Sequence, residues 1–279
     1  MRFCFNETLE TTDLITDVML CNKHGYDSIE IRISYMQSYL KEHSSEDLKK
    51  LLLNSNLKPV AFNSIDNINF TPPTEWKNIL EVFLFCCRQC KEIENPYIIL
   101  CPTESYEVSA KAKEDIFEDS VKVLTTLSYI AEPYGAKIAF EPIGNRRWCV
   151  RSLDEAYRIV QAVNRDNVGL TLDVMNLFCY DGMQDLSTLK EIDINKVFVV
   201  HINDAVDLPI DLLEPEQHRV LPGDGVIPLK EFFEILYKKG YKGDVSLELF
   251  GDICRKPNPE DVISDGIYKM KKVLQPIVS

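Results

Sequence analysis

VFVVHINDAVD, residues 197–207, places a run of apolar, mostly β-branched residues directly before a segment that contains His201, Asn203 and Asp204. Such a run is typical of a buried strand in a parallel sheet. The polar residues then lie at the carboxyl end of that strand. We therefore expect the His201 imidazole at the end of the strand, on the side where α/β barrels build their sites.

Three further apolar runs end in an acidic residue: KIAFE at Glu141, VGLTLD at Asp173 and DVSLE at Glu248. A carboxylate drawn toward a low-dielectric interior needs compensation, which a divalent metal ion supplies directly. Three carboxylates and one imidazole suit Mn, Zn, Co or Mg better than a sulfur-preferring metal. The sequence therefore predicts one divalent ion held by Glu141, Asp173, His201 and Glu248. The alternative is that each carboxylate pairs with an Arg or Lys at the rim.

Apolar runs alternate with segments of helical period along the chain. The candidate strands are 2–6, 28–32, 59–63, 97–101, 137–141, 168–173, 197–202 and 245–250. The candidate helices are 11–24, 45–55, 75–93, 110–134, 152–164, 229–239 and 259–275, with N-cap residues that include Thr11, Ser45, Thr74, Ser152 and Asn258. Eight strand–helix repeats with right-handed crossovers close a (β/α)8 barrel. We expect an α/β protein with a single TIM-barrel domain over residues 1–279.

The segment that follows the seventh strand, residues 201–228, has no clear periodicity. A loop of this length in a compact domain is more often functional than idle. Its PGDG turn, residues 222–225, has glycines that permit positive φ and close approach of the backbone to a ligand. Arg219 is placed to reach a substrate oxygen or to neutralise a carboxylate; the alternative is an exposed cation. His218 ranks behind His201 as a ligand, because we expect it to be solvated.

Bulk properties exclude several classes of function. The chain has 44 acidic and 31 basic residues and a net charge of -13, which would repel a phosphate backbone, so we expect no nucleic-acid partner. No apolar stretch reaches the roughly 18 to 20 residues that a membrane span needs. The segment MRFCFNETLE contains no hydrophobic run of signal-peptide length. We expect a cytoplasmic protein with no membrane partner.

The nine cysteines are odd in number, and only Cys86, Cys87 and Cys90 cluster. These three lie in an amphipathic helical pattern with no second Cys or His pair near them in sequence. In such a setting Cys behaves as a small apolar residue. We interpret the cluster as packing residues with reduced thiols rather than as a metal or redox site.

Seven segments occur in order and at matching strand positions of a known superfamily. They are FCFNETLE, CNKHGYDSIEIR, LSYIAEPYGAKIAFEPIG, VNRDNVGLTLDVMN, HIND, RVLPGDGVIP and SLELF. Together they resemble the sugar isomerase/epimerase superfamily, whose members have a xylose-isomerase-like TIM barrel. The likeness runs over essentially the whole chain and is strongest to members that act on inososes, the ketones of inositol.

The resemblance implies roles for individual residues. It makes Glu141, Asp173, His201 and Glu248 metal ligands, and Glu141 and Glu248 also the paired acid and base. Arg219 matches an arginine that contacts substrate oxygen, and Glu30 matches a recurrent acidic position with a supporting role. One position departs from the family: a His commonly stands three residues after the sixth-strand Asp, where this chain has Asn176. Asn can donate a hydrogen bond to substrate but cannot hold a proton near neutral pH.

The resemblance also implies an activity. We expect a metal-dependent isomerase or epimerase of a keto-polyol, an inosose or a ketose, that removes a proton next to the carbonyl to form an enediolate. This activity would belong to carbohydrate metabolism and myo-inositol catabolism. The alternatives are inosose dehydration at the same site and a barrel that binds a polyol without turnover. An apurinic endonuclease is disfavoured by only four histidines and the charge of -13. The sequence leaves a homo-oligomer open.

Overall fold

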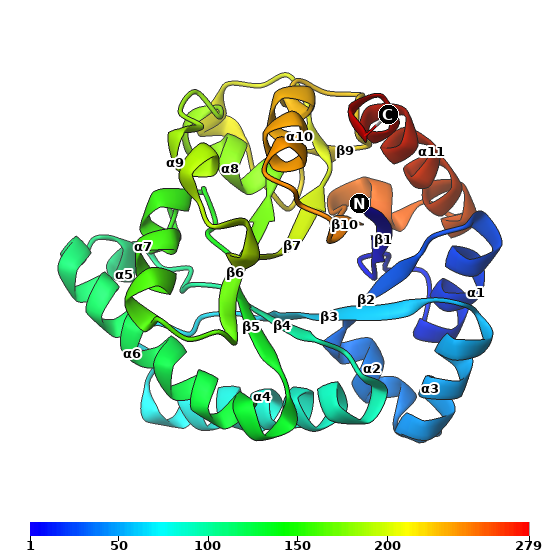
Figure 1. The fold of residues 1–279 in the computed structure, drawn as a ribbon, viewed down its shortest axis with the longest axis horizontal. Helices are drawn as coiled ribbons and strands as arrows, with labels where there is room; N and C mark the ends of the chain where they lie inside the picture. The colour runs from blue at the N-terminus through cyan, green and yellow to red at the C-terminus, as the bar shows by residue number, and fades with distance from the viewer. Residues whose placement is uncertain (279) are drawn as a thin grey trace.

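The computed structural model describes residues 1–278 and contains a closed barrel of parallel strands (Figure 1). The strands of the barrel are β1 (Arg2–Asn6), β2 (Ser28–Arg32), β3 (Lys58–Ile65), β4 (Tyr97–Leu100), β5 (Lys137–Phe140), β6 (Val168–Asp173), β7 (Val197–Ile202) and β10 (Asp244–Leu247). Their order around the barrel is β1-β10-β7-β6-β5-β4-β3-β2, so the last strand closes onto the first. The predicted (β/α)8 fold is confirmed.

Helices cover the outside of the barrel (Figure 1). The α-helices are α1 (Leu14–His24), α2 (Ile33–Tyr39), α3 (Ser45–Asn54), α4 (Pro73–Ile93), α5 (Tyr106–Ser109), α6 (Lys113–Ala131), α7 (Leu153–Val163), α8 (Val174–Asp181), α9 (Ser187–Glu191), α10 (Leu229–Lys238) and α11 (Pro259–Val278). Short 3-10 segments are η1 (Glu132–Tyr134), η2 (Ile194–Lys196), η3 (Ile210–Leu212) and η4 (Gly251–Arg255). Among the described residues, no helix is both long enough and apolar enough to cross a membrane.

Helix starts follow the capping side chains. Ser152 caps α7 in a capping box with Glu155, as predicted. The starts of three other helices are shifted: Asp13 caps α1 in place of Thr11, Ser44 caps α3 in place of Ser45, and α4 begins after Pro72, ahead of Thr74. Helix α11 begins directly after Asn258, as expected. Helix α8 was not predicted, and its N-cap is Asp173, whose carboxylate accepts a hydrogen bond from the Asn176 N–H.

Two apolar clusters divide the core. The larger lies between the barrel and the helices and includes Cys86, Cys87 and Cys90, which confirms their interpretation as packing residues. The smaller contains strand residues such as Cys4, Ala139 and Val199 and fills the barrel interior.

The barrel interior becomes polar at its C-terminal mouth. Since side chains alternate along a strand, residues two positions beyond an interior residue face the interior as well. Glu141 therefore follows Ala139 on the same side of its strand, and His201 follows Val199. This alternation places buried polar groups directly above a small apolar layer.

Candidate metal centre

The four predicted ligands meet at the mouth of the barrel. Glu141 directly follows β5, Asp173 ends β6, His201 lies in β7, and Glu248 directly follows β10. Asp173 and His201 are paired across neighbouring strands. One ligand atom from each of the four buried side chains lies within 4.8 Å of the others.

The Nδ1 atom of His201 is the centre of this group. It lies 3.1 Å from a Glu248 oxygen, 3.6 Å from an Asp173 oxygen and 3.7 Å from a Glu141 oxygen. Yet it has no hydrogen-bond partner among the described residues, although the imidazole is fully buried. A buried ring nitrogen that faces three carboxylates without hydrogen-bond geometry fits a site for a divalent cation.

Glu30 contacts the other ring nitrogen of the same imidazole. Both of its carboxylate oxygens lie 3.2 Å from His201 Nε2, and the two side chains are fully buried. A carboxylate on one ring nitrogen fixes the proton there and leaves the lone pair of the other nitrogen for a metal ion. The supporting role expected of Glu30 is consistent with this geometry.

Arg219 is buried against the same carboxylates. Its Nη1 atom donates to Asp173 Oδ2 at 2.6 Å and to Glu248 Oε2 at 2.9 Å, while its Nε donates to the Pro215 carbonyl. The alternative of an exposed cation is therefore wrong. One guanidinium still leaves an excess of negative charge, because Glu30 and Glu141 belong to the same buried group.

Burial and the neighbouring charges shift the pKa values of Glu141, Asp173 and His201. Burial raises the pKa of Glu141 well above its ordinary value. Burial also works to raise the pKa of Asp173, yet Arg219 and His201 hold it below its ordinary range. For His201, burial works to lower the pKa, but Glu248, Glu30 and Glu141 raise it well above the usual value. The group therefore attracts positive charge, as protons or as a metal ion.

Side-chain amides donate to every one of the three ligand carboxylates. Asn6 and Asn63 donate to Glu248 Oε1 at 3.1 and 2.9 Å, and Asn203 donates to Asp173 Oδ2 at 3.1 Å. Asn176 donates to Glu141 Oε1 at 2.8 Å. Such outer contacts orient the side chains that bind a metal ion.

Sequence reasoning assigned no site role to Asn6, Asn63 or Asn203, although it placed Asn203 at the end of its strand. A signal was present, because the first and third predicted strands, RFCFN and PVAFN, end in Asn just as others end in Glu or Asp. Asn176, which was singled out, is 2% exposed, and its Oδ1 has no hydrogen-bond partner among the described residues.

A cavity of about 490 Å³ opens onto the site. Glu141, Asn176, Arg219 and Glu248 line it, as does Trp148. This volume lies within the range of small-molecule sites, roughly 300 to 1,000 Å³.

The loop after β7 covers one side of the cavity. Glu214 and Glu216 from this loop line it. Glu214 accepts hydrogen bonds from Asn145 at 3.1 Å and from Arg147 at 3.3 Å, which ties the loop to the segment after β5. His218 is half-buried and accepts a hydrogen bond from the Glu214 backbone, so it lies outside the ligand group.

The PGDG turn supports the loop itself. A side chain at Gly225 would collide with the Ala205 carbonyl, and Gly223 has φ +84°. Asp204 accepts hydrogen bonds from the backbone of Gly223 and Ile227. Here β8 (Asp204–Ala205) pairs with β9 (Arg219–Val220), which positions Arg219. The glycines of the turn were expected to let the backbone approach a ligand, but here they allow it to approach the loop's own backbone. Residues 222–225 are not among those that line the cavity.

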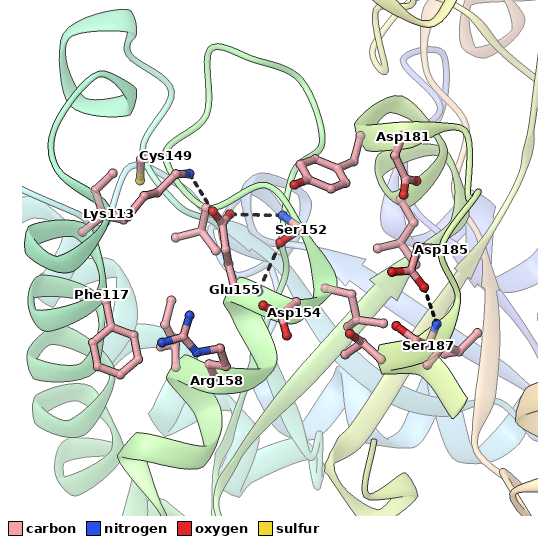
Figure 2. Close-up of a pocket in the computed structure, with 18 of the residues that line it drawn as sticks. Lys113, Phe117, Cys149, Ser152, Asp154, Glu155, Arg158, Asp181, Asp185 and Ser187 are labelled. Atoms are coloured by element: carbon pink, nitrogen blue, oxygen red, sulfur yellow. Dashed lines mark hydrogen bonds and ion pairs between the residues drawn. The ribbon is translucent and has the colours of Figure 1, made fainter. Parts of the chain in front are cut away.

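A second cavity of about 480 Å³ lies outside the barrel, among α6, α7, α8 and α9 (Figure 2). One ion pair lies in its lining: Lys113 Nζ is 2.6 Å from Glu155 Oε1, and the Glu155 carboxylate also accepts a hydrogen bond from the Ser152 backbone. No buried polar atom without a hydrogen-bond partner, among the described residues, belongs to its lining. The barrel cavity is therefore the candidate site.

Comparisons with known proteins agree with this geometry. A family model described as "Xylose isomerase-like TIM barrel" matches residues 18–273. The inosose isomerase of Bacillus subtilis is 39% identical over 282 residues, covering 100% of this chain and 98% of that protein. The inosose isomerase of Halalkalibacterium halodurans is 39% identical over 253 residues, covering 90% and 88%. The resemblance inferred from the motifs is confirmed.

A solved structure, described as that of IOLI protein with a binding zinc atom, is also similar. It superposes with a TM-score of 0.94 at 38% identity, covering 100% of both chains.

The first prediction concerns metal binding. The wild-type protein should bind one divalent ion per chain, and His201→Ala should weaken the affinity by more than about 100-fold, because losing a ligand costs more than the 10- to 100-fold of an outer contact. Calorimetric titration with Zn²⁺ measures this. His218→Ala is the matched control and should bind like the wild type. Wild-type affinity in His201→Ala would contradict the assignment.

Proposed function

The chain belongs to the xylose isomerase-like TIM barrel family and is an isomerase, and from this premise we propose that it isomerises a neutral keto-polyol of the inosose type. The observation that carries the proposal is the buried His201 Nδ1 atom, which faces three carboxylates; two of them, Glu141 and Glu248, line a cavity of small-molecule size. The inosose isomerases named above support the substrate class.

We propose that Glu141, Asp173, His201 and Glu248 hold one divalent ion. Zinc is the first candidate, since the similar solved structure is described with a bound zinc atom; Mn, Co and Mg suit the same oxygen-rich set. When bound, such an ion supplies Lewis acidity that polarises the substrate carbonyl and acidifies the neighbouring C–H.

The two glutamates carry the proton transfers in this proposal. One carboxylate removes the proton from the carbon next to the carbonyl, which gives the enediolate, and the other glutamate, as a carboxylic acid, donates its proton to the carbonyl oxygen, which gives the enediol. The second glutamate, now ionised, then takes the proton of the neighbouring hydroxyl, while the first returns its proton to the former carbonyl carbon. The carbonyl thereby moves by one position without any net change in atoms or electrons.

The hydrogen bonds on the two glutamates suggest how they divide the work. Glu248 accepts from Asn6, Asn63 and Arg219, and these three donors fix the position of its carboxylate beside the cavity. Glu141 accepts from Asn176 alone among its side-chain donors in the described chain. We assign the first proton abstraction to Glu248 and proton delivery to Glu141.

Arg219 and Asn176 complete the substrate contacts that we propose. The protein contacts of Arg219 use Nε and Nη1, and its guanidinium lines the cavity, so its Nη2 group can donate to a substrate oxygen. Asn176 presents its amide beside Glu141. Where the family has a histidine, Asn176 positions an oxygen of the substrate and does not take part in proton transfer.

The charge of the cavity favours a neutral substrate. Six carboxylates but only three guanidinium groups line it. Arg147 is paired with Glu104 and Glu214, and Arg219 with Asp173 and Glu248, while Arg32 is exposed. An anionic substrate would therefore meet repulsion that the paired arginines do not offset.

We place the protein in the cytoplasm and in myo-inositol catabolism. All nine cysteines are free and buried, as expected for a compartment that keeps thiols reduced. The inosose isomerase relatives support the metabolic role.

The second prediction tests the base. Glu248→Gln should slow exchange of the substrate α-hydrogen with solvent deuterium by roughly 10²- to 10⁴-fold, the usual worth of a general base. Proton NMR of an inosose in D₂O follows this exchange, and the same spectra distinguish isomerisation from loss of water. Glu231→Gln, on the exposed face of α10, is the control and should exchange normally. Exchange at the wild-type rate in Glu248→Gln would remove this residue from the base role.

The third prediction tests the charge preference. A carboxylated cyclohexenone polyol should inhibit at least about 100-fold more weakly than a neutral cyclic keto-polyol of similar size, because like charges across a binding site cost several kcal/mol. Inhibition constants measured at low ionic strength give the comparison. Equal inhibition by the two compounds would show that the acidic lining does not select substrates.

A further inference from the structure

Asn6 lies between two strands that supply different parts of the site. Strand β1 is the neighbour of β2, which carries Glu30, and of β10, after which Glu248 follows. Asn6 is paired with Glu30 across β1 and β2. It is the last residue of its strand and is 1% exposed.

The amide of Asn6 is bonded on both sides. Its Nδ2 group donates to Glu30 Oε1 at 2.9 Å and to Glu248 Oε1 at 3.1 Å. An amide nitrogen carries two N–H bonds, so one donor can serve each carboxylate. Glu30 in turn contacts His201 Nε2, and Glu248 contacts His201 Nδ1 through its other oxygen. The Asn6 side chain is therefore hydrogen-bonded to both carboxylates, Glu30 and Glu248, that contact the two ring nitrogens of His201.

We propose that Asn6 is a positioning residue that sets two metal ligands at once; this inference rests on the metal-dependent function proposed above. By fixing Glu30, Asn6 keeps the proton of His201 on Nε2 and leaves the Nδ1 lone pair free. By occupying Oε1 of Glu248, it turns Oε2 toward the ligand group. Without the shared amide, each of these two buried carboxylates would lose one hydrogen-bond donor.

Asn63 separates the two effects. It donates to the same Glu248 Oε1 atom at 2.9 Å, and its side chain has no hydrogen bond to Glu30 in the described structure. Asn63→Ala therefore removes support from Glu248 only, whereas Asn6→Ala removes it from both carboxylates.

Asn95 offers a structural control. It is 2% exposed, and its Nδ2 group also contacts two acceptors, the Tyr97 carbonyl and the Cys90 sulfur. It precedes β4 and thus lies at the opposite end of the barrel. Asn95→Ala removes a buried amide and leaves the contacts of the proposed metal ligands unchanged.

The test is the Zn²⁺ dissociation constant, measured by calorimetry against a competing chelator, together with the Tm of the metal-free protein. Asn6→Ala should weaken Zn²⁺ binding by about 10- to 100-fold, the range for outer contacts of metal ligands. Asn63→Ala should weaken it by less than Asn6→Ala does. Asn95→Ala should lower Tm and leave the dissociation constant unchanged.

Asn6→Ser covers the case in which Asn6→Ala does not fold. The serine hydroxyl has one O–H donor and can donate to only one carboxylate. The Zn²⁺ affinity of the Asn6→Ser variant should therefore be lower than that of the wild type. Wild-type affinity in a folded Asn6 variant, or a loss no larger than that of Asn63→Ala, would overturn the positioning role. Failure of the wild-type protein to bind Zn²⁺, Mn²⁺, Co²⁺ or Mg²⁺ would instead overturn the proposed function.

Discussion

Excess negative charge buried around one imidazole is the constraint on which the site depends. Glu30, Glu141, Asp173 and Glu248 surround His201, and Arg219 is the guanidinium buried among them. Removing charges from water is costly unless they are paired, so a barrel that gathers these residues needs further positive charge. In the proposed function a divalent ion would meet that need at His201 Nδ1, a buried atom that has no hydrogen-bond partner among the described residues.

The barrel creates this constraint by a simple rule. Each parallel strand leaves the apolar interior at the same end, and the residue two positions beyond an interior side chain faces the mouth. Since β1 lies between β2 and β10, an Asn at the end of β1 can contact a carboxylate on either side. The loop after β7 then adds Arg219 above the carboxylates and closes one side of the cavity through Glu214.

The strands and the meeting of Glu141, Asp173, His201 and Glu248 at one end of the barrel were predictable, because a fully buried parallel strand is a continuous apolar run and a charged residue at its end stands out. Helices α2, α5, α8 and α9 were missed because they are short, and α8 begins where Asp173 caps it. Asn6 and Asn63 were missed because an Asn after a strand is equally typical of a turn. Their partners, like the contact of Gly225 with Ala205, exist only once distant segments meet in the closed barrel.

Anomalous X-ray diffraction at the zinc edge, from crystals grown with Zn²⁺, tests the central claim most directly. The account predicts one anomalous peak at the barrel mouth, about 2.0 to 2.2 Å from His201 Nδ1 and from carboxylate oxygens of Glu141, Asp173 and Glu248. His201 Nε2 should remain against Glu30. A peak elsewhere, or an empty site in which a protonated His201 donates from Nδ1 to Glu248, would contradict it.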